Sequence, residues 1–234
     1  MSTTKKLEAL TIPATGEHKS TLIYLHGLGD TGHGWSSLVE NFRLRSLFQH
    51  TEFIFPHAPI RPITCNGGMK MPGWYDIPEF RDLLSREDSA GLNTSRSQIT
   101  SLIQAQLDKG IPASRIILGG FSQGAVTALY TGLTLPYAIG GVVCMSGYLP
   151  LRDAFKDMDR AANQGTKIFM GHGEQDMVVR YAWGVLTRDV LKGLGYEVMW
   201  RSYAGLDHSA NTEEIGDLEG WLEGRIGRKG DGVV

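Results

Sequence analysis

The chain has 234 residues, of which 41% are hydrophobic and 21% charged, and its formal net charge at pH 7 is −2. These values are typical of one well-packed globular domain and argue against a disordered, fibrous or membrane-spanning protein. The few basic clusters lie at the two ends of the chain, so the concentrated basic surface of a nucleic-acid-binding protein is missing.

The sequence predicts a single domain over residues 1–234, with a polar lead-in at 1–6 and a tail at 225–234 that are both flexible. The first ten residues contain no apolar stretch of the kind found in secretion signals, and no apolar run approaches the ~20 residues that span a bilayer. We therefore expect a cytoplasmic protein without stable membrane insertion, present as a monomer or weak homodimer.

Cys65 and Cys144 lack metal-ligand spacing, which argues against a disulfide framework or zinc site and favours a buried thiol at Cys144.

Short apolar runs recur along the chain and are separated by longer segments with helical signals. They are nearly continuous in Val, Ile, Leu and Phe, which is typical of strands buried on both faces of a parallel sheet. These runs are 21–25, 52–55, 115–118, 141–145, 167–170 and 198–203.

The clearest helical signal begins at Ser95, where Ser95 and Gln98 form an S-x-x-Q capping box, and ends at Gly110 and Pro112. Strands that alternate with helices predict an α/β fold, with a mostly parallel central sheet and helices on both faces. Ligands of such folds bind beyond the carboxyl ends of the strands, so functional residues should follow the apolar runs. Further helices are predicted at 125–135, 181–191 and 211–222.

The stretch Gly120–Gly124 reads Gly-Phe-Ser-Gln-Gly and matches the pattern G-x-S-x-G. It lies between a predicted strand and a predicted helix, where a nucleophilic serine occupies a tight turn that needs small neighbours. Ser122 is therefore the candidate nucleophile. The alternative interpretation is a glycine-rich structural turn whose serine caps a helix.

A nucleophilic serine needs a base, which in this fold follows it in the chain together with an acid. Only His172 and His208 follow Ser122. His208 comes after the last apolar run and before the last helix, whereas His172 lies at the end of a predicted strand. We therefore predict His208 as the base.

The acid should come from the loop after the run at 167–170. Asp176 is preferred to Glu174 because it lies deeper in this loop, just before the next helix. Asp207 is a weaker candidate, since it is adjacent to His208 and neighbouring side chains point in different directions. The alternative role of Asp176 is that of a helix-capping residue.

The tetrahedral intermediate also needs two hydrogen-bond donors for its oxyanion. The pattern predicts the backbone N–H of Gln123, directly after the nucleophile, and that of Leu28 in the glycine-rich turn after the first parallel strand. His26 is interpreted as structural support for this turn. The histidines at 33, 50 and 57 have no partner at metal-ligand spacing, so no metal and no cofactor are expected.

The chain resembles the acyl-protein thioesterases and related small carboxylesterases of the α/β-hydrolase superfamily, because several short sequence motifs occur in the same order as in that family. The likeness runs from about residue 21 to about residue 222. Relatives of this kind imply the same triad and oxyanion donors as above. The motifs are LHGLGDTGHGW, PHAPIRPIT, MPGWYDI, IPASRIILGGFSQGA, SGYLPLR, GHGEQDMVV and GLDHS.

The resemblance also implies that residues 62–77 form a loop arm over the active site and that Trp74 lines the acyl channel, although a core aromatic is an equal alternative. Further substrate contacts are predicted at Leu149 and Met177. Met177 stands where many relatives have proline, and the N-terminus lacks the cysteine that is palmitoylated in some animal members.

The function implied is hydrolysis of acyl thioesters on S-acylated proteins through an acyl-enzyme intermediate. A general carboxylesterase or lysophospholipase acting on lipid or small esters would use the same triad. A non-catalytic α/β-hydrolase that binds a ligand is the third alternative.

Overall fold

The computed structural model describes residues 7–79 and 86–227, which are arranged around a seven-stranded sheet. The strand order is β1-β3-β2-β6-β7-β8-β9, and every neighbouring pair is parallel except β1 with β3. This arrangement confirms the predicted α/β-hydrolase class. The strands are β1 (Ala9–Ile12), β2 (Ser20–Leu25), β3 (Thr51–Pro56), β6 (Ile116–Phe121), β7 (Gly141–Met145), β8 (Ile168–Gly173) and β9 (Val198–Tyr203).

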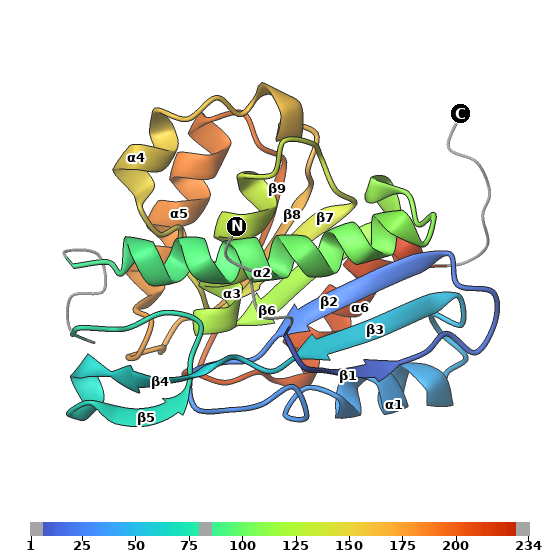
Figure 1. Cartoon of the computed structure of the whole chain (residues 1–234), viewed down its shortest axis with the longest axis horizontal. Coiled ribbons are helices and arrows are strands. Elements are labelled where there is room, and N and C mark those ends of the chain that lie inside the picture. The colour runs from blue at the N-terminus through green and yellow to red at the C-terminus, as the bar shows by residue number, and fades with distance from the viewer. Residues whose placement is uncertain (1–6, 80–85, 228–234) are drawn as a thin grey trace, which may run out of the picture.

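Helices cover both faces of the sheet (Figure 1). They are α1 (Ser37–Leu44), α2 (Ser89–Asp108), α3 (Gln123–Leu133), α4 (Arg152–Lys156), α5 (Tyr181–Gly193) and α6 (Thr212–Ile226). Side chains alternate along each strand, so that Leu22 and Tyr24 pack with α1 and α6, whereas Ile23 and Leu25 pack with α2 and α3. The sheet therefore divides the core into two hydrophobic clusters.

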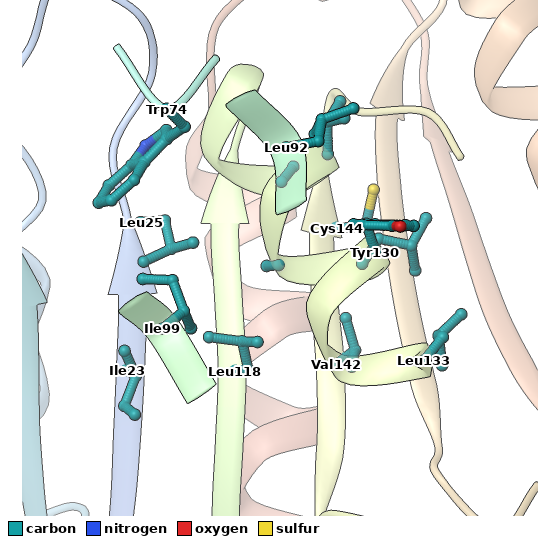
Figure 2. Close-up of a cluster of buried hydrophobic side chains, with 14 of the residues drawn as sticks. Ile23, Leu25, Trp74, Leu92, Ile99, Leu118, Tyr130, Leu133, Val142 and Cys144 are labelled. Carbon is teal, nitrogen blue, oxygen red and sulfur yellow. The ribbon is translucent and has the colours of Figure 1, made fainter. Parts of the chain in front are cut away.

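The larger cluster reaches the carboxyl end of β2, where Trp74 lies beyond Leu25 (Figure 2). Trp74 has no exposed surface, and its indole N–H donates to the carbonyl oxygen of His26 at 2.8 Å. Cys144 is fully buried in the same cluster, as its sequence context predicts.

A separate antiparallel hairpin, β4 (Ile60–Ile63) with β5 (Met69–Pro72), forms most of the segment predicted as a loop arm. Gly67 and Gly68 turn the chain with φ values of 65° and 77°, a region that favours glycine. The N–H of Gly29 donates to the carbonyl oxygen of Pro72 at 2.8 Å, which ties the hairpin to the loop after β2.

Two sequence-based boundaries are wrong. Helix α2 begins at Ser89 and is capped by Asp88, whose carboxylate accepts from the Gly91 N–H, whereas Ser95 is buried inside the helix and donates to the carbonyl oxygen of Trp74. The predicted tail starts too early, because α6 continues to the buried Ile226. The remainder of the tail, 228–234, and the lead-in, 1–6, lie outside the described residues.

Within the described residues, no helix is long and apolar enough to cross a membrane. The same part of the chain holds no group of three histidine, cysteine or acidic side chains placed to bind a metal ion.

Candidate active site

Ser122 occupies the turn between β6 and α3 with φ 54° and ψ −122°, a strained conformation for a residue with a side chain. A Cβ on Gly120 would lie 2.5 Å from the carbonyl carbon of Gly124, and a Cβ on Gly124 would lie 2.2 Å from the carbonyl oxygen of Leu25. Both glycines of the pattern are therefore required by backbone contacts. The turn directs the serine hydroxyl out of the carboxyl end of the sheet.

The three residues predicted as a triad are connected by hydrogen bonds. The Ser122 hydroxyl lies 2.8 Å from Nε2 of His208, and Nδ1 of the same imidazole lies 2.7 Å from Oδ2 of Asp176. The loops after β6, β8 and β9 bring them together from positions up to 86 residues apart in sequence. This order and geometry suit a serine activated by a histidine that a carboxylate orients.

Asp176 is held as a charged carboxylate. Its Oδ1 accepts from the backbone N–H groups of Val178 and Val179, each at 2.9 Å. Burial alone would raise the pKa of Asp176, but hydrogen bonding with His172 and His208 and with the Val178 N–H outweighs it and lowers the pKa below its ordinary value. A permanent negative charge therefore faces the imidazole of His208.

The two predicted oxyanion donors lie next to the nucleophile on the wall of one cavity. Among the described residues, the backbone N–H groups of Leu28 and Gln123 have no acceptor in the protein, and the Gln123 N–H is the first N–H group of helix α3.

The side chain of Gln123 has a role that the sequence does not predict. It accepts from the N–H of Trp74 at 2.8 Å and donates to the carbonyl oxygen of Tyr75 at 2.7 Å.

The cavity over Ser122 has a volume of about 560 Å³. Trp74 and Leu149 lie in the core, with 0% and 1% of their surfaces exposed, and neither contributes to the cavity wall. Burial of Trp74 favours the alternative interpretation as a core aromatic, and substrate contact by Trp74 or Leu149 stays a prediction. Met177 is 82% exposed and also outside the wall, whereas the next two residues, Val178 and Val179, line it.

Comparison with known proteins identifies the family. The family model described as phospholipase/carboxylesterase matches residues 8–226. The chain belongs to this family. Acyl-protein thioesterase 1 of Neurospora crassa is 45% identical over 99% of this chain and 97% of its own, and that of Saccharomyces cerevisiae is 41% identical over 88% and 92%. The crystal structure of Zea mays acyl-protein thioesterase 2 superposes with a TM-score of 0.81 at 30% identity, covering 94% of this chain and 99% of that chain.

In this member of the family, two further histidines support the site from inside the core. Nε2 of His26 accepts from the Ala58 N–H at 3.1 Å, so that Nδ1 carries the proton and donates to the carbonyl oxygen of Gly27 at 2.7 Å. Nε2 of His172 donates to the carbonyl oxygen of Val179 at 2.7 Å and lies 3.5 Å from Oδ2 of Asp176. The supporting role of His26 agrees with its sequence-based interpretation, whereas the sequence predicts no role for His172.

Glu214 is a fully buried carboxyl group in the first turn of α6, and neither of its oxygens has a hydrogen-bond partner among the described residues. It packs against Gly171, where a Cβ would lie 2.3 Å from Oε1. Burial raises the pKa of Glu214 to about 8, and the negative charges of Asp176 and Asp217 add to this effect. The side chain is therefore neutral at pH 7.

Replacement of Glu214 by Gln is expected to change the pH dependence of stability. Because the folded-state pKa is raised, the contribution of this group is fully present below the unfolded-state pKa and is lost as pH rises through about 8. The free energy of unfolding of Glu214→Gln relative to wild type should therefore increase by a few kcal/mol between about pH 5 and about pH 9. The corresponding increase in its relative Tm is roughly 5–10 °C. Thermal unfolding at both pH values measures the change.

Glu213→Gln provides the matched control, because Glu213 is exposed on the same turn of α6. Its Tm difference from wild type should not depend on pH in this way. The same Tm difference for Glu214→Gln at both pH values would contradict a neutral buried acid.

Proposed function

We propose that this protein is a serine hydrolase that removes S-linked fatty acyl groups from proteins. The observation that carries the proposal is the hydrogen-bonded series Ser122–His208–Asp176 opening into a cavity of about 560 Å³. The names of the fungal relatives support the choice of acyl-protein thioesters among possible substrates. The expectations of a cytoplasmic location and of a monomer or weak homodimer stay predictions.

The reaction proceeds in two steps. Nε2 of His208 takes the proton of Ser122 as Oγ attacks the acyl carbonyl, and the backbone N–H groups of Leu28 and Gln123 stabilise the oxyanion. The imidazolium then protonates the departing thiolate, which leaves the acyl group as an ester of Ser122. A water molecule deprotonated by the same histidine hydrolyses this ester and restores the serine.

The charge of Asp176 has a specific task in both steps. It accepts the Nδ1 proton of His208, which keeps the lone pair of Nε2 available to Ser122. It also stabilises the imidazolium that forms in each step, because an opposite charge at 2.7 Å favours the protonated ring. Its own hydrogen bonds to Val178 and Val179 prevent the carboxylate from rotating away.

Part of the cavity wall is suited to an acyl chain. Tyr75, Ile77, Val126 and Tyr148 line it and belong to, or adjoin, the larger hydrophobic cluster. Each methylene group buried there contributes about 0.8 kcal/mol, which corresponds to roughly a fourfold gain in affinity or in kcat/KM.

We expect kcat/KM to rise with acyl length from acetyl through octanoyl and to level off when the chain fills the cavity. The measurement is hydrolysis of a series of nitrophenyl esters from acetyl to palmitoyl, together with release of palmitate from an S-palmitoylated peptide. A maximum at acetyl without palmitate release would contradict the thioesterase proposal and favour a general carboxylesterase. Hydrolysis of lysophospholipids but not of acylated peptides would favour a lysophospholipase.

A further inference from the structure

The cavity over Ser122 has two sides that belong to different parts of the core. Tyr75 and Tyr148 on one side pack in the cluster formed with α2 and α3. Trp35 and Phe121 on the other side pack against the cluster formed with α1 and α6. The nucleophile lies at the turn between β6 and α3. An ester has two portions, the acyl group and the leaving group, and the cavity offers one side for each.

The first side, which is apolar and bears the Tyr75–Tyr148 pair, fits the acyl chain of the proposed reaction. The second side must then receive the leaving group, and it is the side that carries charge. Asp30 is the one acidic residue among the described residues that line the cavity, and no lysine or arginine lines it.

The Asp30 carboxylate is fixed in direction by its own turn. Its Oδ1 accepts from the N–H of Thr31 at 2.7 Å, and its backbone N–H donates to the carbonyl oxygen of Gly27 at 3.3 Å. A Cβ on Gly34 would lie 2.0 Å from Oδ2, so the carboxylate packs closely against Gly34. Among the described residues, no cationic side chain lies within 4 Å of this carboxylate.

An aromatic ring accompanies the carboxylate. Trp35 lines the same side of the cavity, half-buried, with its ring centroid 5.0 Å from that of Tyr24 and 5.4 Å from that of Phe121. Phe121 in turn lies 4.9 Å from the imidazole of His208. A carboxylate and an indole face are the two kinds of group that attract an organic cation.

We propose that Asp30 and Trp35 form a subsite for a lysine or arginine side chain next to the S-acylated cysteine of a protein substrate. The inference rests on the proposed thioesterase function. A polypeptide is favoured over a small headgroup because Gly29, Thr31, His33 and Gly34 are all exposed, so that this side opens to solvent and leaves room for chain on both sides of the cysteine. The subsite determines which acylated cysteines are hydrolysed fastest.

The test uses S-octanoyl peptides that are identical except for lysine, glutamine or glutamate beside the modified cysteine. Wild type should hydrolyse the lysine peptide about tenfold faster than the glutamate peptide in kcat/KM, with the glutamine peptide between them, and added salt should reduce this ratio. In Asp30→Asn, which keeps the acceptor for the Thr31 N–H, the lysine-to-glutamate ratio should fall to about twofold or less.

Asp189→Asn is the matched control, because Asp189 is exposed on α5 and pairs with Arg188 away from the cavity. It should retain the wild-type ratio. Equal rates for the three peptides in wild type, or an unchanged ratio in Asp30→Asn, would overturn the subsite. A ratio reduced equally in Asp189→Asn would overturn it as well, since overall charge would then explain the preference.

Failure of the proposed function would give a different result. If no acylated peptide is hydrolysed, while small esters are, the thioesterase proposal fails, and the charge comparison is repeated with butyrylthiocholine and its neutral dimethylbutyl analogue. A preference for the cationic ester that depends on Asp30 would then identify a cation subsite for small esters or lipid headgroups and overturn the peptide assignment. Equal rates for the two esters would overturn the subsite altogether.

Discussion

Ser122→Ala is expected to lower kcat by about 10⁶-fold and to abolish covalent labelling by a fluorophosphonate probe, while the protein stays folded. The hydroxyl removed is the group that lies 2.8 Å from His208 Nε2, so the loss removes the nucleophile itself. Alanine adopts the same strained backbone at φ 54° no less readily than serine, so the turn should persist. Ester hydrolysis, probe labelling and circular dichroism measure the three effects.

Ser101→Ala is the control for this experiment, because Ser101 is exposed on α2 and its hydroxyl contacts only the carbonyl oxygen of Ser97. It should hydrolyse esters and label like wild type. Unfolding of Ser122→Ala would indicate that the serine is structural. Persistent turnover in a folded Ser122→Ala protein would contradict the nucleophile assignment and leave a ligand-binding role for the cavity.

Asp176→Asn is expected to lower kcat by about 10⁴-fold, although only one atom changes. Oδ1 accepts two backbone N–H groups, from Val178 and Val179, so the asparagine oxygen will take that position and its NH₂ group will face His208. Nδ1 of His208 must then accept, which moves the proton to Nε2. In that tautomer the imidazole cannot take the proton of Ser122.

Glu174→Gln makes the same chemical change two residues away, on an exposed side chain. We expect its kcat to remain within about twofold of wild type. Steady-state kinetics on one ester substrate compares the two variants, and the opposite ranking would reverse the assignment of the acid. Equal losses in both would indicate that the loop, rather than a particular carboxylate, is disturbed.

Most of the parallel strands could be predicted from sequence because they are buried on both faces and rich in apolar residues, whereas the edge strand β9 is partly exposed. The runs at 141–145 and 198–203 match β7 and β9 at both ends. The hairpin β4–β5 could not be predicted in this way. Its residues are partly exposed and include Pro62 and Pro72, so neither a continuous apolar run nor a clear alternation marks it.

The start of α2 was misplaced because a capping pattern can occur inside a helix. Ser95 satisfies S-x-x-Q, but its hydroxyl is used by a distant carbonyl, that of Trp74, and the helix begins six residues earlier behind Asp88. Asp88 followed by Gly91 is a weaker sequence pattern for a helix start than the S-x-x-Q capping box at Ser95. Contacts between segments distant in sequence therefore decided where this helix begins.

The triad residues could be chosen from sequence because the fold fixes their order along the chain, and the geometry brings the chosen three together. The walls of the cavity could not be chosen in the same way. Trp74 and Tyr75 are adjacent aromatic residues, yet only Tyr75 reaches the cavity. Which of two neighbours faces a ligand depends on the local rotation of the backbone, and here the Gln123 amide sets that rotation.

The amide of Gln123 holds the backbone of the Trp74–Tyr75 turn from both sides, while its own N–H lies one residue after the nucleophile. The proposed acyl wall at Tyr75 and the proposed oxyanion donor of Gln123 are therefore joined by two hydrogen bonds of one side chain. Removal of the Gln123 amide would leave the Trp74 N–H and the Tyr75 carbonyl oxygen without their partner. A change one residue after the nucleophile would thus reach the wall that receives the acyl chain.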